Sequence, residues 1–128
     1  MIPHGTRIFV CTANVDMRKS FDGLAAAAQG ATSVDSESGA LFVFANRKSN
    51  RLKVLWWDRT GYCLLYKRLE WGVFRLPAGN SSGFVNITLA ELAEIIKGIG
   101  LPPKNHRAYA KAVKDAIVVF TNKAKAST

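Results

Sequence analysis

The residues that could support catalysis in this chain of 128 residues are a few scattered carboxylates. The carboxylates that could hold the two cations of phosphodiester chemistry are Asp16, Asp22, Asp58 and Glu70. Their positions do not bring them together, since Asp58 lies in a predicted hairpin turn and Glu70 follows two cations that it can neutralise. We therefore expect no enzyme. A cryptic nuclease built on Asp16, Asp58 and Glu70 is the catalytic alternative.

Nucleophilic catalysis and cofactor binding have little support in the sequence. A Ser or Cys nucleophile needs a histidine base, and His4 and His106 lie near a terminus and before a predicted helix. Cys11 and Cys63 lie in apolar runs and are expected to be buried, reduced thiols, although their spacing leaves a disulfide open. The chain has no pair of Cys or His at zinc-ligand spacing and no Gly-rich phosphate loop. We expect no metal and no cofactor.

Charge is the most informative property of the sequence. The chain has 18 Lys and Arg residues against 9 Asp and Glu residues, which gives a net charge of +9. The excess is concentrated, because residues 47–75 carry eight basic and two acidic residues and residues 97–128 carry seven and one. A polyanion such as DNA is a natural partner for two such segments.

The candidates for phosphate contacts crowd residues 46–51, here called the basic turn, and the strands predicted beside it. They are Arg47, Lys48, Arg51, Lys53, Lys67 and Arg68. Arg18 and Lys19 are second-rank candidates, because Asp16 and Asp22 lie close by in the sequence and can pair with them. Neutralising several phosphates would give an affinity for DNA that depends on salt and tolerates sequence. A solvated basic face or a protein-binding face is the alternative.

Aromatic residues are interleaved with these cations. They are Trp56, Trp57, Tyr62, Tyr66 and Trp71. An exposed aromatic ring can stack on a nucleic-acid base, whereas a buried one belongs to the hydrophobic core. The sequence leaves both interpretations open for each ring.

The elements that must position these side chains follow from the apolar pattern. Runs rich in β-branched and aromatic residues predict strands over 7–12, 40–44, 52–57, 62–69, 72–76 and 84–87. Helical spacing predicts a helix over 20–29, ended by Gly30, and one over 88–99. Thr88 and Glu91 have capping-box spacing at the start of the second helix. We expect an α+β fold in which a twisted antiparallel β-sheet of about five strands, a meander, packs against two helices.

The C-terminal part differs from this predicted domain of residues 1–103. Residues 104–128 predict a basic amphipathic helix with a frayed tail, which could pack on the domain, line DNA or bind a partner. The chain lacks a run of about 18 apolar residues and a signal-peptide pattern. We expect a cytoplasmic protein without a membrane partner.

Three blocks of the sequence resemble one family. They are residues 16–25 (DMRKSFDGLA), a long block from 39–44 (GALFVF) through 50–58 (NRLKVLWWD) to 67–70 (KRLE), and a closing block that starts at 87–92 (ITLAEL). These blocks resemble TnpB, the accessory protein from the second open reading frame of the insertion sequence 66 family of bacterial transposons. The resemblance covers about residues 2–100. Ser20, Asn50 and Leu76 depart from its usual Gly, Asp and Trp.

The resemblance implies a protein encoded beside a larger transposase that carries the DNA cleavage and strand transfer. Such an accessory protein supports efficient transposition and has no established catalytic activity. The expected function is therefore a non-catalytic accessory role in transposition, with DNA, such as the transposon ends, and the transposase as partners. The alternative is a protein-interaction module that docks its basic face on the transposase, with incidental affinity for nucleic acid.

Overall fold

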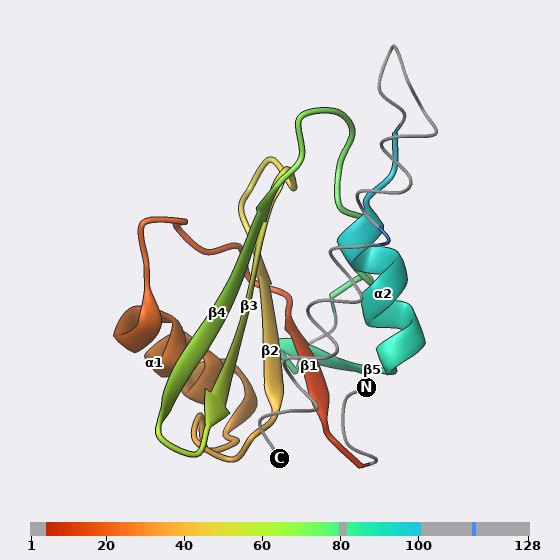
Figure 1. Ribbon diagram of the computed structural model, residues 1–128. Helices are drawn as coiled ribbons and strands as arrows, with labels where there is room; N and C mark the ends of the chain where they lie inside the picture. Colours follow the sequence, from red (N-terminus) through yellow and green to blue (C-terminus); the bar gives the residue numbers. More distant parts are fainter. Residues whose placement is uncertain (1–4, 80–81, 101–113, 115–128) are drawn as a thin grey trace.

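The computed structural model describes residues 5–79, 82–100 and 114, and it confirms the α+β fold (Figure 1). The elements are β1 (Ile8–Cys11), α1 (Phe21–Thr32), β2 (Leu41–Ala45), β3 (Arg51–Asp58), β4 (Gly61–Arg68), β5 (Phe84–Ile87) and α2 (Leu89–Lys97). The strands form one five-stranded sheet in the order β4-β3-β2-β1-β5.

The sheet is mixed, which corrects the prediction of an antiparallel meander throughout. Strands β2, β3 and β4 do form an antiparallel meander, and β5 pairs with β1 in antiparallel fashion. Strand β1 is parallel to β2, with Ile8 opposite Leu41 and Val10 opposite Val43. The reason is the connection, because α1 carries the chain back so that β2 starts at the same end as β1.

The strand predicted at 72–76 is a second difference. The described structure has a single bridge there, from Val73 to Ile99. The backbone N–H of Phe74 instead donates to the carbonyl of Ser49 at 2.7 Å. This segment therefore crosses the end of the sheet and ties the basic turn to the residues that follow α2.

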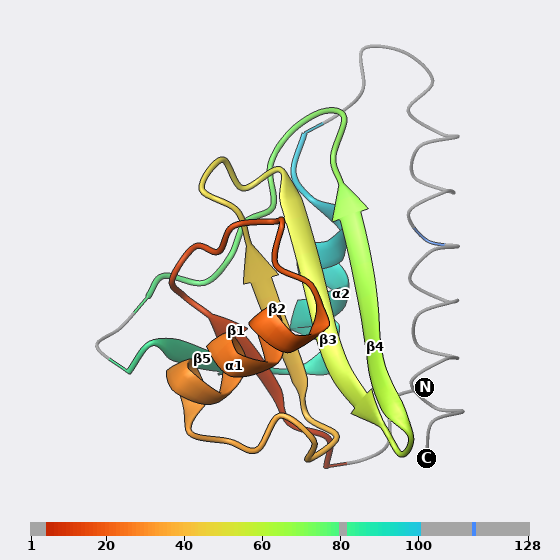
Figure 2. The ribbon, with the colours of Figure 1, turned by 90° about the vertical axis from the view of Figure 1, so that its left-hand side faces the viewer.

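The two helices cover opposite faces of the sheet, as Figures 1 and 2 show from two directions. On the α1 side, Leu24 packs in a buried cluster with Phe42 and Phe44. On the α2 side, Leu92 packs in a second cluster with Val43. Strand β2 is buried along its whole length, as expected for a strand that is apolar on both faces.

The ends of the helices confirm one sequence signal and correct another. At the start of α2, Thr88 Oγ1 accepts from the backbone N–H of Glu91, and Glu91 Oε1 accepts from the N–H of Thr88, which completes the predicted capping box. Helix α1 continues past Gly30 and ends at Thr32, and the C-cap residue Ser33 has a left-handed backbone with φ 58°. The Ser20 side chain does not cap α1.

The structure also bears on the predictions made for the cysteines, the C-terminal helix and membrane spans. Cys11 is buried and Cys63 half-buried, and the two are not joined by a disulfide. The predicted helix over 104–128 lies outside the described residues, apart from Lys114, which is helical and exposed. Among the helices that the structure describes, none combines the length and apolar character needed to cross a bilayer.

Candidate nucleic-acid interface

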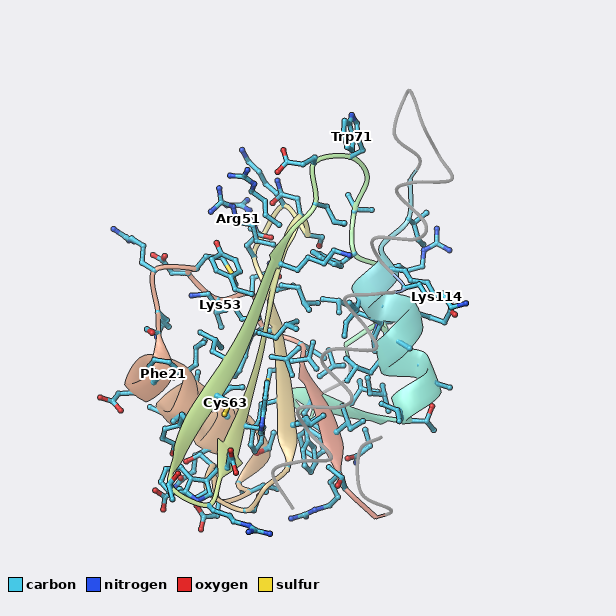
Figure 3. The ribbon with its side chains drawn as sticks, viewed as in Figure 1. Phe21, Arg51, Lys53, Cys63, Trp71 and Lys114 are labelled. Carbon is cyan, nitrogen blue, oxygen red and sulfur yellow. The ribbon has the colours of Figure 1, made fainter. Side chains whose placement is uncertain are left out.

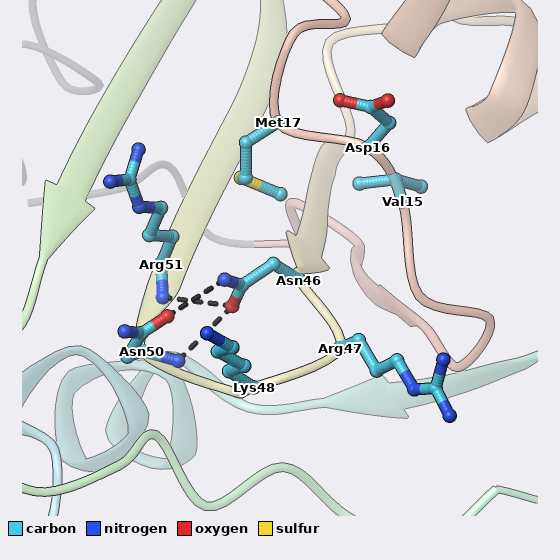
Figure 4. A pocket seen from close by; sticks show the side chains of 8 residues that line it. All are labelled: Val15, Asp16, Met17, Asn46, Arg47, Lys48, Asn50 and Arg51. Atoms are coloured by element: carbon cyan, nitrogen blue, oxygen red, sulfur yellow. Dashed lines mark hydrogen bonds between the residues drawn. The ribbon is translucent and has the colours of Figure 1, made fainter.

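The basic turn connects β2 to β3, and the side chain of Asn46 organises it. Asn46 Oδ1 accepts from the backbone N–H of Asn50 at 3.1 Å and from that of Arg51 at 3.0 Å. Its Nδ2 donates to Asn50 Oδ1 at 2.7 Å, and Figure 4 shows the three bonds together. An Asn that bonds the backbone ahead of it is a common way to close a turn. The turn therefore has a defined shape.

This turn presents its cations to solvent. Arg47 and Lys48 are exposed, and Figure 4 shows the Arg47 side chain extending away from the turn. Arg51 is half-buried, and its Nη1 donates to the hydroxyl of Tyr66 at 2.9 Å. A shallow depression of about 430 Å³ lies between the turn and residues 15–17. Three of the predicted phosphate contacts thus share one surface.

Lys53 does not belong to that surface. Its side chain is 5% exposed, and its Nζ donates to the carbonyls of Met17 at 2.8 Å and Lys19 at 2.7 Å. The ammonium also lies 4.6 Å from the centre of the Tyr66 ring. The chain over residues 17–19 passes above this position and covers it. Lys53 is therefore unavailable to phosphates, and instead it holds that chain segment against the sheet.

The side chain of Lys67 lies on the face of the sheet opposite to that of Arg51 and Arg68. It lies opposite Leu52, whereas Arg68 lies opposite Arg51, and consecutive side chains of a strand point to opposite faces. Lys67 Nζ donates to the carbonyl of Ile96 at 2.8 Å, near the end of α2. Burial lowers the pKa of this ammonium. Its position suits a cation at the C-terminus of a helix, where unpaired carbonyls carry negative charge.

Arg68 and Arg18 each form an exposed ion pair. Arg68 Nη2 lies 2.7 Å from Glu70 Oε1, as expected from the sequence. Arg18 Nε donates to Asp16 Oδ2 at 2.9 Å, and this pairing lowers the pKa of Asp16 to about 2. Exposed pairs of this kind are weak, so a phosphate can compete with the carboxylate for the arginine. Both arginines, together with exposed Lys19, remain at the rim of the surface.

The carboxylates considered for metal chemistry are used elsewhere or lie apart. Asp16 and Glu70 pair with arginines, and Asp58 lies in register with Gly61, at the hairpin end of β3. Within the part of the chain that the structure describes, no group of three His, Cys, Asp or Glu side chains could hold a metal ion.

The charge pattern located the turn but missed Asn46, the residue that shapes it. The signal was present, since an Asn precedes the strand by five residues in a polar stretch that must reverse the chain. The sequence also gave no reason to prefer Tyr66 over the other aromatic residues. Its position opposite Lys53 in the β3–β4 register makes it part of this surface.

Comparison with known proteins supports the family resemblance of the three sequence blocks. The profile of the family described as IS66 Orf2 like protein matches residues 6–106. The chain belongs to this family. Its members are accessory proteins associated with an insertion sequence, so the resemblance that the sequence suggested is confirmed.

Two relatives from Sinorhizobium fredii (strain NBRC 101917 / NGR234) are similar over most of their length. Protein y4hO is 38% identical over 101 residues, which cover 77% of this chain and 87% of the relative. Protein y4jC is 34% identical over 95 residues, which cover 74% and 80%. Both are described as uncharacterized. No solved structure matches the chain.

Proposed function

We propose that this IS66 Orf2-like protein is a non-catalytic accessory factor that binds DNA during transposition of its insertion sequence. The observation that carries the proposal is the basic turn, which holds Arg47, Lys48 and Arg51 on a shaped, solvent-facing loop. Among residues 5–79 and 82–100, no ion pair joins these three cations to a carboxylate. Arg47 and Lys48, which are exposed, can neutralise phosphates without first leaving a carboxylate, and Arg51 has further N–H donors besides the one that bonds Tyr66.

Neighbouring elements of the fold add further cations to the same surface. Arg68 extends it on β4, directly opposite Arg51, and Lys19 and Arg18 extend it on the segment that Lys53 holds. Arg68 already pairs with Glu70, and a phosphate that displaces this exposed carboxylate could lie between the two arginines and reduce their mutual repulsion. A phosphate backbone supplies a row of such anions.

Replacing Arg47 and Lys48 together with glutamine should weaken DNA binding roughly tenfold at low salt and reduce the slope of log affinity against log salt by about two. The physical reason is that two phosphate contacts, with their released counterions, are lost. The measurement is fluorescence anisotropy of a labelled DNA from the end of the insertion sequence, at several salt concentrations.

The matched control is the double variant Arg7→Gln with Arg59→Gln, which removes the same charge. Arg7 precedes β1 and Arg59 lies in the β3–β4 hairpin, so both lie at the opposite end of the sheet from the basic turn. This control should keep the slope of the unchanged protein within about half a unit. Equal losses in the two double variants would reject the basic turn as the site. Binding to the transposase in the absence of any DNA binding would favour the protein-interaction alternative.

A further inference from the structure

Two exposed aromatic side chains flank the basic turn. Tyr66 on β4 is 47% exposed, and Trp71, which follows β4, is 44% exposed. Figure 3 shows Trp71 and Arg51 at the same end of the molecule, with Lys53 below them. Large aromatic surfaces beside unneutralised cations are unusual on a protein surface, and they call for a ligand that uses both.

Tyr66 is held in place by the two cations of β3. Arg51 Nη1 donates to its hydroxyl at 2.9 Å, and Lys53 Nζ lies 4.6 Å from the ring centre. Because Lys53 is buried, the ring face that it approaches is turned inward, yet the Tyr66 side chain is still 47% exposed. A ring fixed in this way loses little conformational freedom when another ring stacks on it.

Trp71 is placed beside the turn by backbone contacts on both sides of it. The N–H of Leu69 donates to the carbonyl of Asn50 at 2.8 Å, and the N–H of Phe74 donates to the carbonyl of Ser49 at 2.7 Å. The loop that carries Trp71 therefore starts and ends on the basic turn. Trp71 is thus carried by a loop that is bonded to the basic turn, and Tyr66 is bonded to Arg51 at the end of that turn.

We infer that this surface binds single-stranded DNA in preference to duplex DNA, an inference that rests on the proposed function. Cations that follow the phosphates and aromatic rings that stack on unpaired bases are the two elements of single-strand binding. A duplex keeps its bases stacked on one another, so Tyr66 and Trp71 could not stack on them, and the cations alone would remain as contacts. The insertion-sequence family makes DNA the nucleic acid concerned.

The test compares a labelled 20-nucleotide single strand of mixed sequence with its own duplex, by fluorescence anisotropy at moderate salt. The unchanged protein should bind the single strand at least about tenfold more tightly. Tyr66→Leu and Trp71→Leu should each lose roughly tenfold of the single-strand affinity and little of the duplex affinity. Tyr66→Phe, which keeps the ring, should stay close to the unchanged protein.

The control is Phe21→Leu, since Phe21 is 45% exposed but lies at the start of α1 and lower on the molecule in Figure 3. It should change neither affinity, and thermal unfolding of each variant checks that the fold is kept. Equal affinity for both DNAs, with no loss in the leucine variants, would overturn the inference and leave the proposed function standing. Absence of binding to either DNA would overturn both.

Discussion

Replacing Lys53 with methionine should lower the free energy of unfolding by about 2–3 kcal/mol. Methionine fills a similar volume and leaves no large cavity, so the expected loss comes from the missing polar contacts. The carbonyls of Met17 and Lys19 would lose a charged donor at 2.8 and 2.7 Å, at a site where Lys53 itself is 5% exposed. Part-buried acceptors that lose their donor cost more than an exposed pair contributes. Urea-induced unfolding followed by far-ultraviolet circular dichroism measures the change.

The matched control is Lys48→Met, in the adjacent turn. Lys48 is exposed, so its replacement should change the free energy of unfolding by about 0.5 kcal/mol or less. Hydrogen exchange gives a second readout, because the N–H of Lys19 donates to the carbonyl of Asp16 and should lose protection when the segment is released. A Lys53 variant as stable as the Lys48 variant would show that Lys53 does not anchor residues 17–19.

Replacing Gly72 with alanine should cost about 2 kcal/mol or more and displace the loop that carries Trp71. Gly72 has φ +78°, a backbone conformation that residues other than glycine rarely adopt. A Cβ there would clash with the carbonyl oxygen of Ile99, lie 2.8 Å from its carbonyl carbon and lie 2.9 Å from the Cα of Gly100. Both neighbours are backbone, so neither can move aside as a flexible side chain would. Thermal and urea unfolding measure the loss.

A second glycine-to-alanine change gives a control of opposite sign. Gly30 lies within α1, and a Cβ there would meet nothing within 4 Å. Gly30→Ala should therefore raise stability by roughly 0.5–1 kcal/mol, through the better helix propensity of alanine. If Gly72→Ala were as stable as Gly30→Ala, the close approach of residues 72 and 99–100 would not contribute to the fold.

Much of the fold was predictable because its local signals agree with its tertiary structure. The runs from Leu41 and from Arg51 are β-rich and continuous, and the Thr88–Glu91 spacing gives a capping box whether or not the rest of the chain is known. The parallel pairing of β1 with β2 was not predictable in the same way. It depends on where α1 packs, which is a property of the two buried faces together and not of either strand.

The candidate site was predictable as a region but not as a set of contacts. Arg51, Lys53 and Lys67 are close in the register, yet the first is half-exposed, the second is covered by residues 17–19, and the third points to the α2 side. When a strand is covered on both faces, the exposure of a lysine in it cannot be predicted from the alternation of side chains. The carbonyls that accept its hydrogen bonds come from segments distant in the sequence. The exposure of Tyr66 has the same long-range origin.

The most direct test of DNA binding at the basic turn is to map it on the protein by nuclear magnetic resonance. Single-stranded DNA of 20 nucleotides would be titrated into the ¹⁵N-labelled protein while the backbone amide shifts are followed. We expect the largest changes in residues 46–51 and 66–71, and their loss in the variant with Arg47→Gln and Lys48→Gln. Changes concentrated instead in the β3–β4 hairpin, in β5 or along α2 would contradict the assignment of the basic turn as the DNA-binding surface.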